Sequence, residues 1–424
     1  MPKTEQAGGK RVSPTRRAAV GFAVLAGLAL LLPTPLVLWG AVGLLTAVVL
    51  DALSVRPAVD VSRSVPTILS RGVPAPMSVA VAGTGVVRQV APPDLAVTPA
   101  VGGPVLEASV TAKRRGRHTL PSPALRRVGP LGLGRWDRWT VTEPAELTVY
   151  PDLHAARRLA AAVRSGTFAD AGLRIRGPLG LGTEFESIRD YQPDDDIRQV
   201  NWRATERMQR PMSNIYRVEQ DRDVVCVVDT GRLMAAPLGN DRTRLDAALD
   251  AVAAVAMAAD VLGDRVGVVA FDRDVRRQVR PRRNGSDAVV GAVYDLEPTD
   301  IESDYELAFR TVGGSKRALV LVLTDLLEES AAKPLVAAAP VLARKHAVVV
   351  AGSTDPDLDS LLTTQPELPI DAYAAAVAVD VLDARRRAVA RLEATGVSVL
   401  EAAPGSLATA CITAYLRLKA RARL

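Results

Sequence analysis

Residues 18–50 contain no charged side chain, and this run constrains the fold more than any other feature of the chain. A run this long and apolar must be buried in protein or in lipid. Pro33 and Pro35 divide it into halves, 18–32 and 36–50, each somewhat shorter than the roughly 20 residues that one spanning helix needs. The run therefore predicts a tight transmembrane helical hairpin over 18–50. A single kinked helix and a shallow re-entrant segment are the alternatives.

The charges around this run predict its orientation. No small-residue cleavage site precedes polar sequence within it, so it does not resemble a signal peptide. Basic residues precede the run (Lys3, Lys10, Arg11, Arg16, Arg17) and follow it (Arg56, Arg63, Arg71). Because positive charge marks cytoplasmic flanks, both ends are expected inside the cell. The prediction is a multi-pass protein of the cell membrane with the bulk of the chain cytoplasmic.

The segments after the run differ in pattern. Residues 55–150 are rich in Pro, Gly, Val and Thr, with short alternating runs such as 77–82 and 107–112, which predicts a β-sandwich-like domain. Residues 153–164 predict a helix. From 223 onward, apolar strand runs alternate with helical patterns, which is typical of a doubly wound α/β domain. The expected strands are 224–228, 266–271, 275–279, 319–323, 347–351 and 397–400, and the main helices are 244–262, 331–345, about 370–394 and 406–418.

The first of these strands ends in an acid. Val224–Val228 is continuous and apolar, as expected of a strand buried on both faces. Asp229 then lies at the carboxyl end of the strand, the edge where ligands bind in open α/β sheets.

Several functional classes receive little support. The net charge of +6 and the pI near 9.5 suggest nucleic acid, but the basic runs are separate and aromatic residues make up only 4% of the chain. Stacking platforms are therefore lacking, and no nucleic-acid partner is expected. Cys226 and Cys411 form no metal-ligand spacing and are expected to be small buried side chains. The three histidines are scattered, so no zinc site is predicted.

A segment dense in acids and arginines, residues 151–222, precedes the α/β domain. Its prominent residues are Glu184, Phe185, Arg189, Tyr191, Pro193, Asp195, Asp196, Arg198, Trp202, Ala204, Thr205 and Arg207. This pattern resembles the signature of the bacterial domain-of-unknown-function family 58, and the resemblance extends upstream and to about residue 330. Asp194 and Asn201 depart from it, standing where the family usually has Gly and Asp.

The resemblance implies a von Willebrand factor A-like domain, whose first strand ends in Asp-x-Ser-x-Ser and whose crevice holds a divalent cation. Asp229 and Asp325 match its two acids, Ser303 matches its second-loop hydroxyl better than Thr299, and Gly231 and Leu233 replace both serines. Mg²⁺ is the candidate ion, since it prefers oxygen ligands. With two hydroxyls missing, the expected site is degenerate. Alternatively, Asp229 and Asp325 cap the turn and the helix that follow them. Weak Mg²⁺ binding or none is expected, and serines at both 231 and 233 are expected to raise the affinity.

Within the signature segment, the loop from Asp190 to Arg207 has two interpretations. Asp195 and Asp196 could hold a cation or act as acid and base. The favoured interpretation is an ion-paired clasp or a partner surface, with Tyr191 and Trp202 packed onto the sheet. Truncation of Trp202 is then expected to cost about 3 to 5 kcal/mol, as for a buried Trp.

The sequence thus predicts a membrane-anchored, non-catalytic protein-interaction module. The resemblance implies a MoxR-type AAA+ ATPase as partner and a role in envelope-related assembly. The alternative is a metal-assisted hydrolase that uses the acidic segment. The predicted organisation is a basic cytoplasmic tail (1–17), the hairpin (18–50), a β-sandwich-like domain (55–150), the signature segment (151–222) and the A-like domain (223–424).

Overall fold

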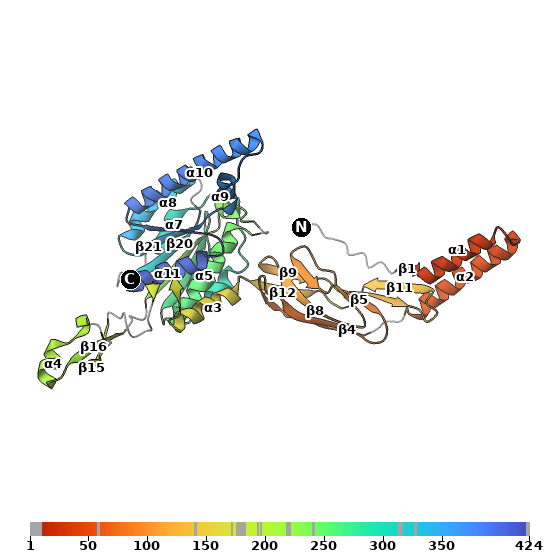
Figure 1. The fold of residues 1–424 in the computed structure, drawn as a ribbon, viewed down its shortest axis with the longest axis horizontal. Helices are drawn as coiled ribbons and strands as arrows, with labels where there is room; N and C mark the ends of the chain where they lie inside the picture. The colour runs from red at the N-terminus through yellow and green to blue at the C-terminus, as the bar shows by residue number, and fades with distance from the viewer. Residues whose placement is uncertain are drawn as a thin grey trace. The chain divides into compact units, whose positions relative to one another are not determined.

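The computed structural model is a mixed α/β protein that divides into two compact units, with the boundary between Val149 and Tyr150 (Figure 1). Helices and strands occur in both. The structure describes residues 11–56, 60–139, 142–170, 173–174, 184–192, 195, 197–217, 222–239, 242–312, 317–325 and 329–420.

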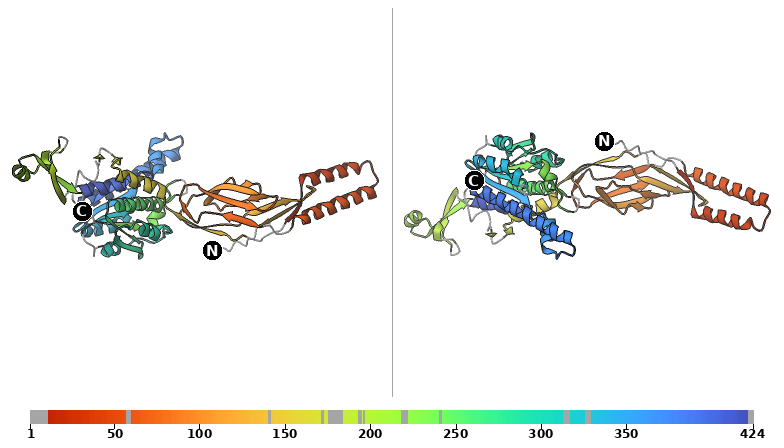
Figure 2. Two further views of the ribbon diagram at one scale, coloured as in Figure 1. Left: turned by 90° about the horizontal axis from the view of Figure 1, so that it is seen from below. Right: turned by 90° about the horizontal axis from the view of Figure 1, so that it is seen from above.

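The first unit begins with a strand and two packed helices. Helix α1 (Arg16–Leu28) is capped by Thr15, and α2 (Thr34–Ser54) starts after Pro33, with Pro35 in its first turn. The two helices lie side by side (Figure 2). Glycines allow this packing, because a Cβ at Gly21 would lie 3.1 Å from Leu44 and one at Gly40 would lie 3.1 Å from Leu25. Among the described helices, only α2 is long and apolar enough to cross a membrane.

The prediction of a separate basic tail over residues 1–17 is partly wrong, because its second half belongs to a strand and a helix. Arg11–Pro14 forms strand β1, which pairs antiparallel with β11 (Gly134–Trp139). The chain then enters α1 at Arg16, two residues before the charge-free run. The strand and the helices are therefore continuous with the β-structure that follows.

The remainder of the first unit consists of antiparallel sheets around one apolar core. One sheet has the strand order β2-β4-β8-β6, a second β3-β12-β9, and a third β1-β11-β10-β5-β7. Buried residues alternate along β4, where Met77, Val79 and Val81 enter this core. The strands are β2 (Val61–Ser64), β3 (Ile68–Ser70), β4 (Ala75–Val81), β5 (Val86–Arg88), β6 (Leu95–Thr98), β7 (Val101–Gly102), β8 (Val105–Ala112), β9 (Gly116–Leu120), β10 (Ala124–Val128) and β12 (Ala145–Tyr150).

The second unit is built on a six-stranded sheet in the order β19-β18-β17-β20-β21-β22. Five strands are parallel, and the edge strand β19 runs antiparallel to β18. The strands are β17 (Asp223–Asp229), β18 (Arg265–Phe271), β19 (Val275–Arg282), β20 (Ala318–Leu323), β21 (Ala347–Ser353) and β22 (Ser398–Ala402). The first five each contain a strand expected from the sequence, and β22 begins one residue after the expected start of 397–400 and ends two residues beyond the expected end.

Helices cover both faces of this sheet. Val224, Cys226 and Val228 of β17 contribute to one core, while Val225 and Val227 contribute to the other. This alternation explains the continuous apolar run. The first face carries α3 (Leu153–Arg164), α5 (Arg244–Val261), α6 (Ser286–Val293) and α11 (Leu407–Ala420). The second face carries α7 (Tyr305–Val312), α8 (Glu329–Ala343) and the C-terminal part of α10 (Pro369–Ala394).

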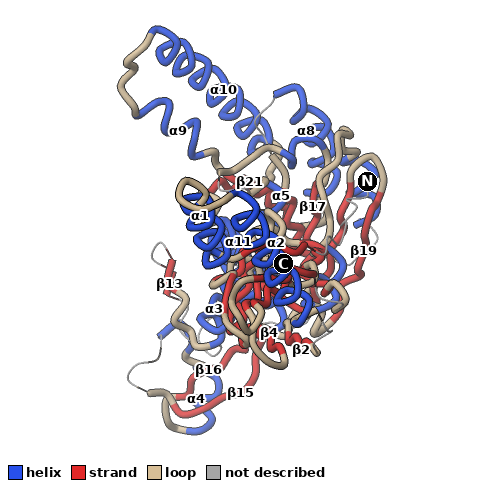
Figure 3. Tube along the Cα trace, turned by 90° about the vertical axis from the view of Figure 1, so that its right-hand side faces the viewer, coloured by secondary structure: helices blue, strands red, loops and turns tan. Residues whose placement is uncertain are grey.

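Several short elements were not expected. Between β21 and β22, helix α9 (Pro356–Thr363) precedes α10 and lies beside it (Figure 3). Within the signature segment the structure describes β13 (Ala169–Asp170), β14 (Leu173–Arg174), β15 (Glu184–Asp190), α4 (Trp202–Met208) and β16 (Met212–Arg217). Helices α6 and α7 were also missed, because eight-residue helices give only two turns of periodicity.

Candidate functional site

The signature residues lie on a β-hairpin, called here the signature hairpin, which comprises β15, α4 and β16. Strands β15 and β16 pair antiparallel, from Glu184 opposite Arg217 to Asp190 opposite Met212. Asn201 caps α4 by accepting a hydrogen bond from the Ala204 amide at 3.0 Å, and its amide donates to Asn214 at 2.8 Å. The departure from Asp at this position therefore preserves the cap.

An ion-paired clasp holds the turn after β15. The Asp195 carboxylate accepts hydrogen bonds from Arg189 at 2.5 Å and from the Gln192 amide at 2.9 Å. The Tyr191 hydroxyl donates to the Asp195 carbonyl at 3.2 Å. Thr205 accepts from the Met212 amide at 2.9 Å, which ties α4 to β16.

Other predicted members of the signature are placed less fully. Pro193, Asp194 and Asp196 lie outside the described residues. The side chains of Glu184, Phe185 and Arg198 likewise lie outside what the structure describes, although the backbone of each is placed. The Arg207 side chain is exposed in the last turn of α4.

The expectation that Trp202 packs into the fold is wrong. Trp202 begins α4 and is 70% exposed. Ile188, Ile197 and Met208 are also exposed on the signature hairpin. Tyr191 is only half-buried and acts within the clasp. The described part of the hairpin thus presents an aromatic and three aliphatic side chains to its surroundings.

The second candidate site is the crevice at the carboxyl end of β17. The Asp229 carboxylate accepts four hydrogen bonds there. Its Oδ1 accepts from the Gly231 amide at 2.8 Å and from Ser303 at 2.5 Å. Its Oδ2 accepts from the Tyr305 and Thr324 hydroxyls, both at 2.7 Å. Ser303 therefore lies beside Asp229, as predicted, and the Gly231 contact makes Asp229 a cap of its own turn.

The Tyr305 hydroxyl donates a hydrogen bond to Asp229 in its protonated form. Burial raises the pKa of its hydroxyl well above the ordinary value, and the Asp229 charge raises the pKa further. The phenol stays protonated near neutral pH and continues to donate to Asp229. The carboxylate lone pairs are thus directed at protein donors.

Asp325 forms a buried ion pair with an arginine. Arg244 lies 2.8 Å from Asp325, and each side chain is only 2% exposed. The same guanidinium reaches Asp355 at 3.0 Å and the Ser353 carbonyl at 3.3 Å. Arg244 is placed there because it is the first residue of α5, whose start is fixed by a capping box of Thr243 and Asp246.

These contacts do not fit the divalent cation that the resemblance implies. The Asp229 oxygens are engaged by four donors, and Asp325 forms an ion pair with Arg244, which also pairs with Asp355. Thr230 donates to the Phe271 carbonyl, and Thr299 donates to Asp272 and the Thr230 carbonyl. Neither of these hydroxyls turns toward Asp229. Within the described part of the chain, no three His, Cys, Asp or Glu side chains gather as a metal site.

Serine at 231 would not restore a metal site in this backbone. A Cβ at Gly231 would lie 2.2 Å from the Ser303 hydroxyl and 2.7 Å from the Ile301 carbonyl. Such contacts require the backbone of the crevice to move, so the expected gain in Mg²⁺ affinity is not supported.

Sequence reasoning missed three residues of the crevice: Arg244, Tyr305 and Thr324. The available signal for Arg244 was that it is the only basic residue of α5 and stands at the start of the helix. Tyr305 directly follows Asp304, and Thr324 directly precedes Asp325, so both lie beside acids of the expected crevice loops. The prediction for the cysteines is confirmed: Cys226 and Cys411 are buried, and burial raises the pKa of Cys226 to about 12.

Comparisons with known proteins support the family resemblance. Residues 187–390 match the family described as protein of unknown function DUF58. No curated protein matches the chain. Among solved structures, a mutant of the PilB minor pilin from Streptococcus sanguinis is 8% identical, covers 80% of this chain and 88% of its own, and has a TM-score of 0.33. An uncharacterized membrane spanning protein from Vibrio fischeri is 16% identical, covers 47% of this chain and 98% of its own, and has a TM-score of 0.14. Both TM-scores are too low to support an argument about fold.

Proposed function

We propose that this protein is a membrane-anchored, non-catalytic interaction module whose partner binds the signature hairpin. The exposure of Trp202 carries this proposal, because a large aromatic side chain left open beside Ile197 and Met208 is typical of a contact surface. The clasp of Arg189 and Asp195 presents this surface on an ordered hairpin. By family resemblance, the partner is a MoxR-type AAA+ ATPase and the process is envelope-related assembly.

The second unit is proposed to be a von Willebrand factor A-like domain with a degenerate ion site. Support comes from the strand order, from the helices on both faces and from Asp229 at the end of the central strand β17. In this domain the Arg244 guanidinium supplies positive charge beside Asp325 in place of the cation. No described contact favours the hydrolase alternative, since Asp195 and Asp229 both accept several donors.

The membrane anchor is proposed to be the helical hairpin of α1 and α2. Strand β1 precedes α1 and pairs with β11, which follows α2. Both ends of the helical pair must therefore lie on one side of a membrane. If α2 spans the bilayer, α1 has to return across it, and the flanking arginines favour the cytoplasm for the folded units.

Binding of the purified MoxR-type ATPase of the same cell to the full-length protein in mild detergent tests the function. Trp202→Ala should weaken binding at least tenfold while leaving stability unchanged. Tyr373→Ala is the matched control, because Tyr373 is an equally exposed aromatic (68%) of the same unit outside the hairpin. Unchanged binding by Trp202→Ala, or loss with Tyr373→Ala alone, would remove the signature hairpin from the contact.

A further inference from the structure

The edge strand β19 carries a dense row of arginines, called here the arginine edge (residues 275–283). It contains five arginines and no acid, and the acids nearest in sequence are Asp274 before it and Asp287 after it. Strand β19 ends the six-stranded sheet on one side, so no described strand pairs with its outer side (Figure 3). Charge on an edge strand hinders pairing with another sheet, but charges of either sign serve that purpose. Five positive charges without an acid therefore suggest an anionic partner.

Most of these arginines are not neutralised within the fold. Arg276 is half-buried, donates to the Glu297 carbonyl at 2.9 Å and lies 3.7 Å from Asp272. Arg277 donates to the neighbouring Arg276 carbonyl at 2.9 Å, which leaves its charge uncompensated. The exposed members of the row that form no ion pair with a described residue are Arg277, Arg280 and Arg282.

A recess opens beside the arginine edge. This cavity of about 420 Å³ lies between β19, the starts of β17 and β18 and the end of α7. Its polar lining includes Arg265, Gln278, Arg280 and Thr311, and Asp223 is the one acid of the lining. Asp223 lies 2.7 Å from Arg265, so the positive charge of Arg280 is in excess there. Such a recess can receive one phosphate group, because arginine binds phosphate through charge-assisted hydrogen bonds.

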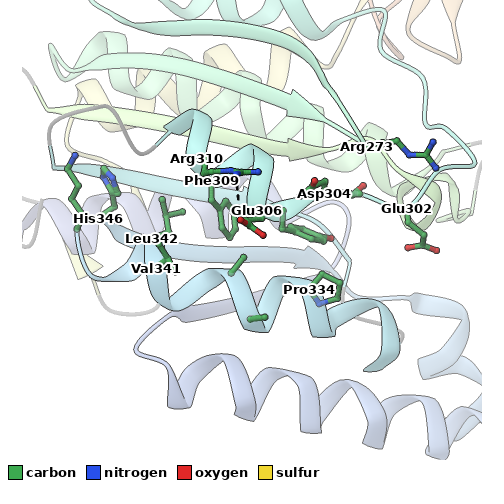
Figure 4. A pocket seen from close by; sticks show the side chains of 15 residues that line it. Arg273, Glu302, Asp304, Glu306, Phe309, Arg310, Pro334, Val341, Leu342 and His346 are labelled. Carbon is green, nitrogen blue, oxygen red and sulfur yellow. Dashed lines mark ion pairs between the residues drawn. The ribbon is translucent and has the colours of Figure 1, made fainter.

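The larger groove of the second unit differs in charge. It encloses about 1080 Å³ between α7 and α8 (Figure 4). Its lining carries acids and bases in equal number: Glu302, Asp304, Glu306, Arg273, Arg310 and Lys345. Charge therefore selects no class of occupant for the groove, whereas the arginine edge selects an anion.

The surroundings of the arginines restrict the kind of anion. Among the described residues of the arginine edge and its recess, no large hydrophobic side chain is exposed, and Val275 and Val279 are half-buried. Protein interfaces are usually centred on aromatic or apolar anchors, and single-stranded nucleic acids need stacking side chains. A layer of anionic lipid headgroups needs only clustered positive charge. The arginine edge therefore fits a lipid surface better than a protein or a nucleic acid.

The membrane anchor proposed above would hold this unit near such a surface, and the inference rests on that anchor. Tethering raises the effective concentration of the leaflet around the unit, so individually weak contacts become populated. We propose that the arginine edge binds the phosphate headgroups of anionic lipids in the membrane that holds α1 and α2, with one headgroup seated in the recess beside Arg280.

Arginine labelling with phenylglyoxal tests the proposal on the full-length protein in nanodiscs. Mass spectrometry gives the rate at each arginine in discs of phosphatidylcholine alone and in discs that also contain phosphatidylglycerol. The anionic lipid should slow the labelling of Arg277, Arg280 and Arg282 at least threefold, because a bound headgroup shields each guanidinium. Arg157 and Arg158, exposed on α3, are the internal control and should keep their rates. Unchanged rates at the arginine edge, or equal slowing on α3, would overturn the proposal.

Two variants with the same change in net charge sharpen the test. The edge variant combines Arg277→Gln, Arg280→Gln and Arg282→Gln. The control variant combines Arg157→Gln, Arg158→Gln and Arg164→Gln, all exposed on α3. The slowing at the neighbouring Arg283 should disappear in the edge variant and persist in the control variant. Protection of Cys226 and Cys411 from a thiol reagent verifies that both fold. Equal loss in both variants would show an effect of net charge alone and overturn the proposal.

Soluble anions identify the source of the phosphate. In phosphatidylcholine discs, millimolar inorganic phosphate should not slow labelling at the arginine edge. Slowing as large as that caused by phosphatidylglycerol would assign the recess to a free anion and overturn the lipid assignment. Slowing by a single-stranded RNA oligonucleotide but not by phosphatidylglycerol would overturn it in favour of nucleic acid.

The same experiment separates this inference from the proposals on which the function rests. A chain that does not enter nanodiscs would overturn the anchor and this inference together. An inserted chain without slowing at the arginine edge would overturn this inference alone. Binding of the ATPase by the signature hairpin is measured independently of both results.

Discussion

Arg244 determines what the crevice can do. The planar guanidinium reaches Asp325, Asp355 and a backbone carbonyl at once. The attraction within a buried pair of this kind is largely offset by the cost of removing both charges from water, so the pair adds little net stability. Removing one partner is nevertheless costly, because the other remains buried and uncompensated.

Arg244→Ala should lower the free energy of unfolding of the second unit by about 3 to 5 kcal/mol. Arg242→Ala is the matched control, since the Arg242 pair with Asp250 is partly exposed and should be worth less than about 1 kcal/mol. Pulsed thiol labelling of the full-length protein in urea measures both, because Cys226 and Cys411 are buried in this unit. Equal effects of the two substitutions would contradict the role given to Arg244.

His346 should make stability depend on pH. Burial lowers the pKa of His346, and nearby Lys345 lowers the pKa further. The ring accepts a hydrogen bond at Nδ1 from the Ala318 amide, at 3.2 Å. Below the unfolded pKa of about 6.5, the unfolded chain gains a proton that the folded state resists. Stability should thus fall as the pH drops through 6.5 toward the folded pKa, and should not change from this group above 6.5.

The measurement is the urea midpoint from thiol labelling between pH 7.5 and 5.5. His346→Asn, whose amide oxygen can replace Nδ1 as acceptor, should flatten the profile. His154→Asn should leave the slope unchanged, because His154 is exposed on α3. A slope equal in wild type and His346→Asn would assign the pH dependence to other groups.

At the scale of elements, periodicity predicted the sheet unit well and the signature segment poorly. The strands of the sheet are long apolar runs, and α5 and α10 extend over many turns, so the pattern identifies them. The hairpin of β15 and β16 carries charges on both strands and lacks such a pattern. Trp202 was misplaced for the same reason, because an aromatic residue beside charges does not reveal whether a core lies beneath it. The contacts of Arg244 with Asp325 and Asp355 join residues over 80 positions apart, which local patterns cannot predict.

Helix α2 is fastened to the β-structure by its one acid. Asp51 is buried, and its carboxylate accepts hydrogen bonds from the amides of Leu131 and Leu133 at 2.8 Å and of Gly134 at 2.9 Å. Glycine is required at 134, because a Cβ there would lie 2.2 Å from the Val48 carbonyl and 2.6 Å from the Ala52 amide. The last turn of a candidate membrane helix is thereby held against the β10–β11 turn.

Asp51→Asn should loosen this junction. The side-chain NH₂ of asparagine would face backbone N–H groups, which are donors themselves. At least one hydrogen bond to a charged acceptor is therefore lost, which costs about 1.5 to 3 kcal/mol of stability. Amide hydrogen exchange of residues 131–134 should accelerate at least tenfold, measured on the full-length protein in detergent. Thr46→Ala is the control, since its hydroxyl only bonds within the helix. Unchanged exchange in Asp51→Asn would show that packing alone holds α2.

At the scale of the whole molecule, the pairing of β1 with β11 constrains how the proposed anchor can be placed in a membrane. Val12 pairs with Trp136, so residues on either side of the two helices belong to one sheet. A single span would separate these partners by a bilayer and break the sheet. Two arrangements remain compatible with the pairing: a hairpin that crosses and returns, and a shallow re-entrant segment. They differ at the turn between α1 and α2, where Leu30 is 89% exposed.

Cysteine labelling in intact cells with a membrane-impermeant reagent separates these arrangements. Val12→Cys and Ser64→Cys flank the helices on exposed positions, and both should be protected until the cells are opened. Leu30→Cys should react from outside if the hairpin crosses the bilayer, because α2 alone, at about 1.5 Å per residue, is long enough to span the hydrocarbon core. Protection at all three positions would indicate a re-entrant segment, since the turn then stays within the inner leaflet. Labelling at only one of Val12→Cys and Ser64→Cys would contradict the pairing of β1 with β11, and with it the proposed anchor.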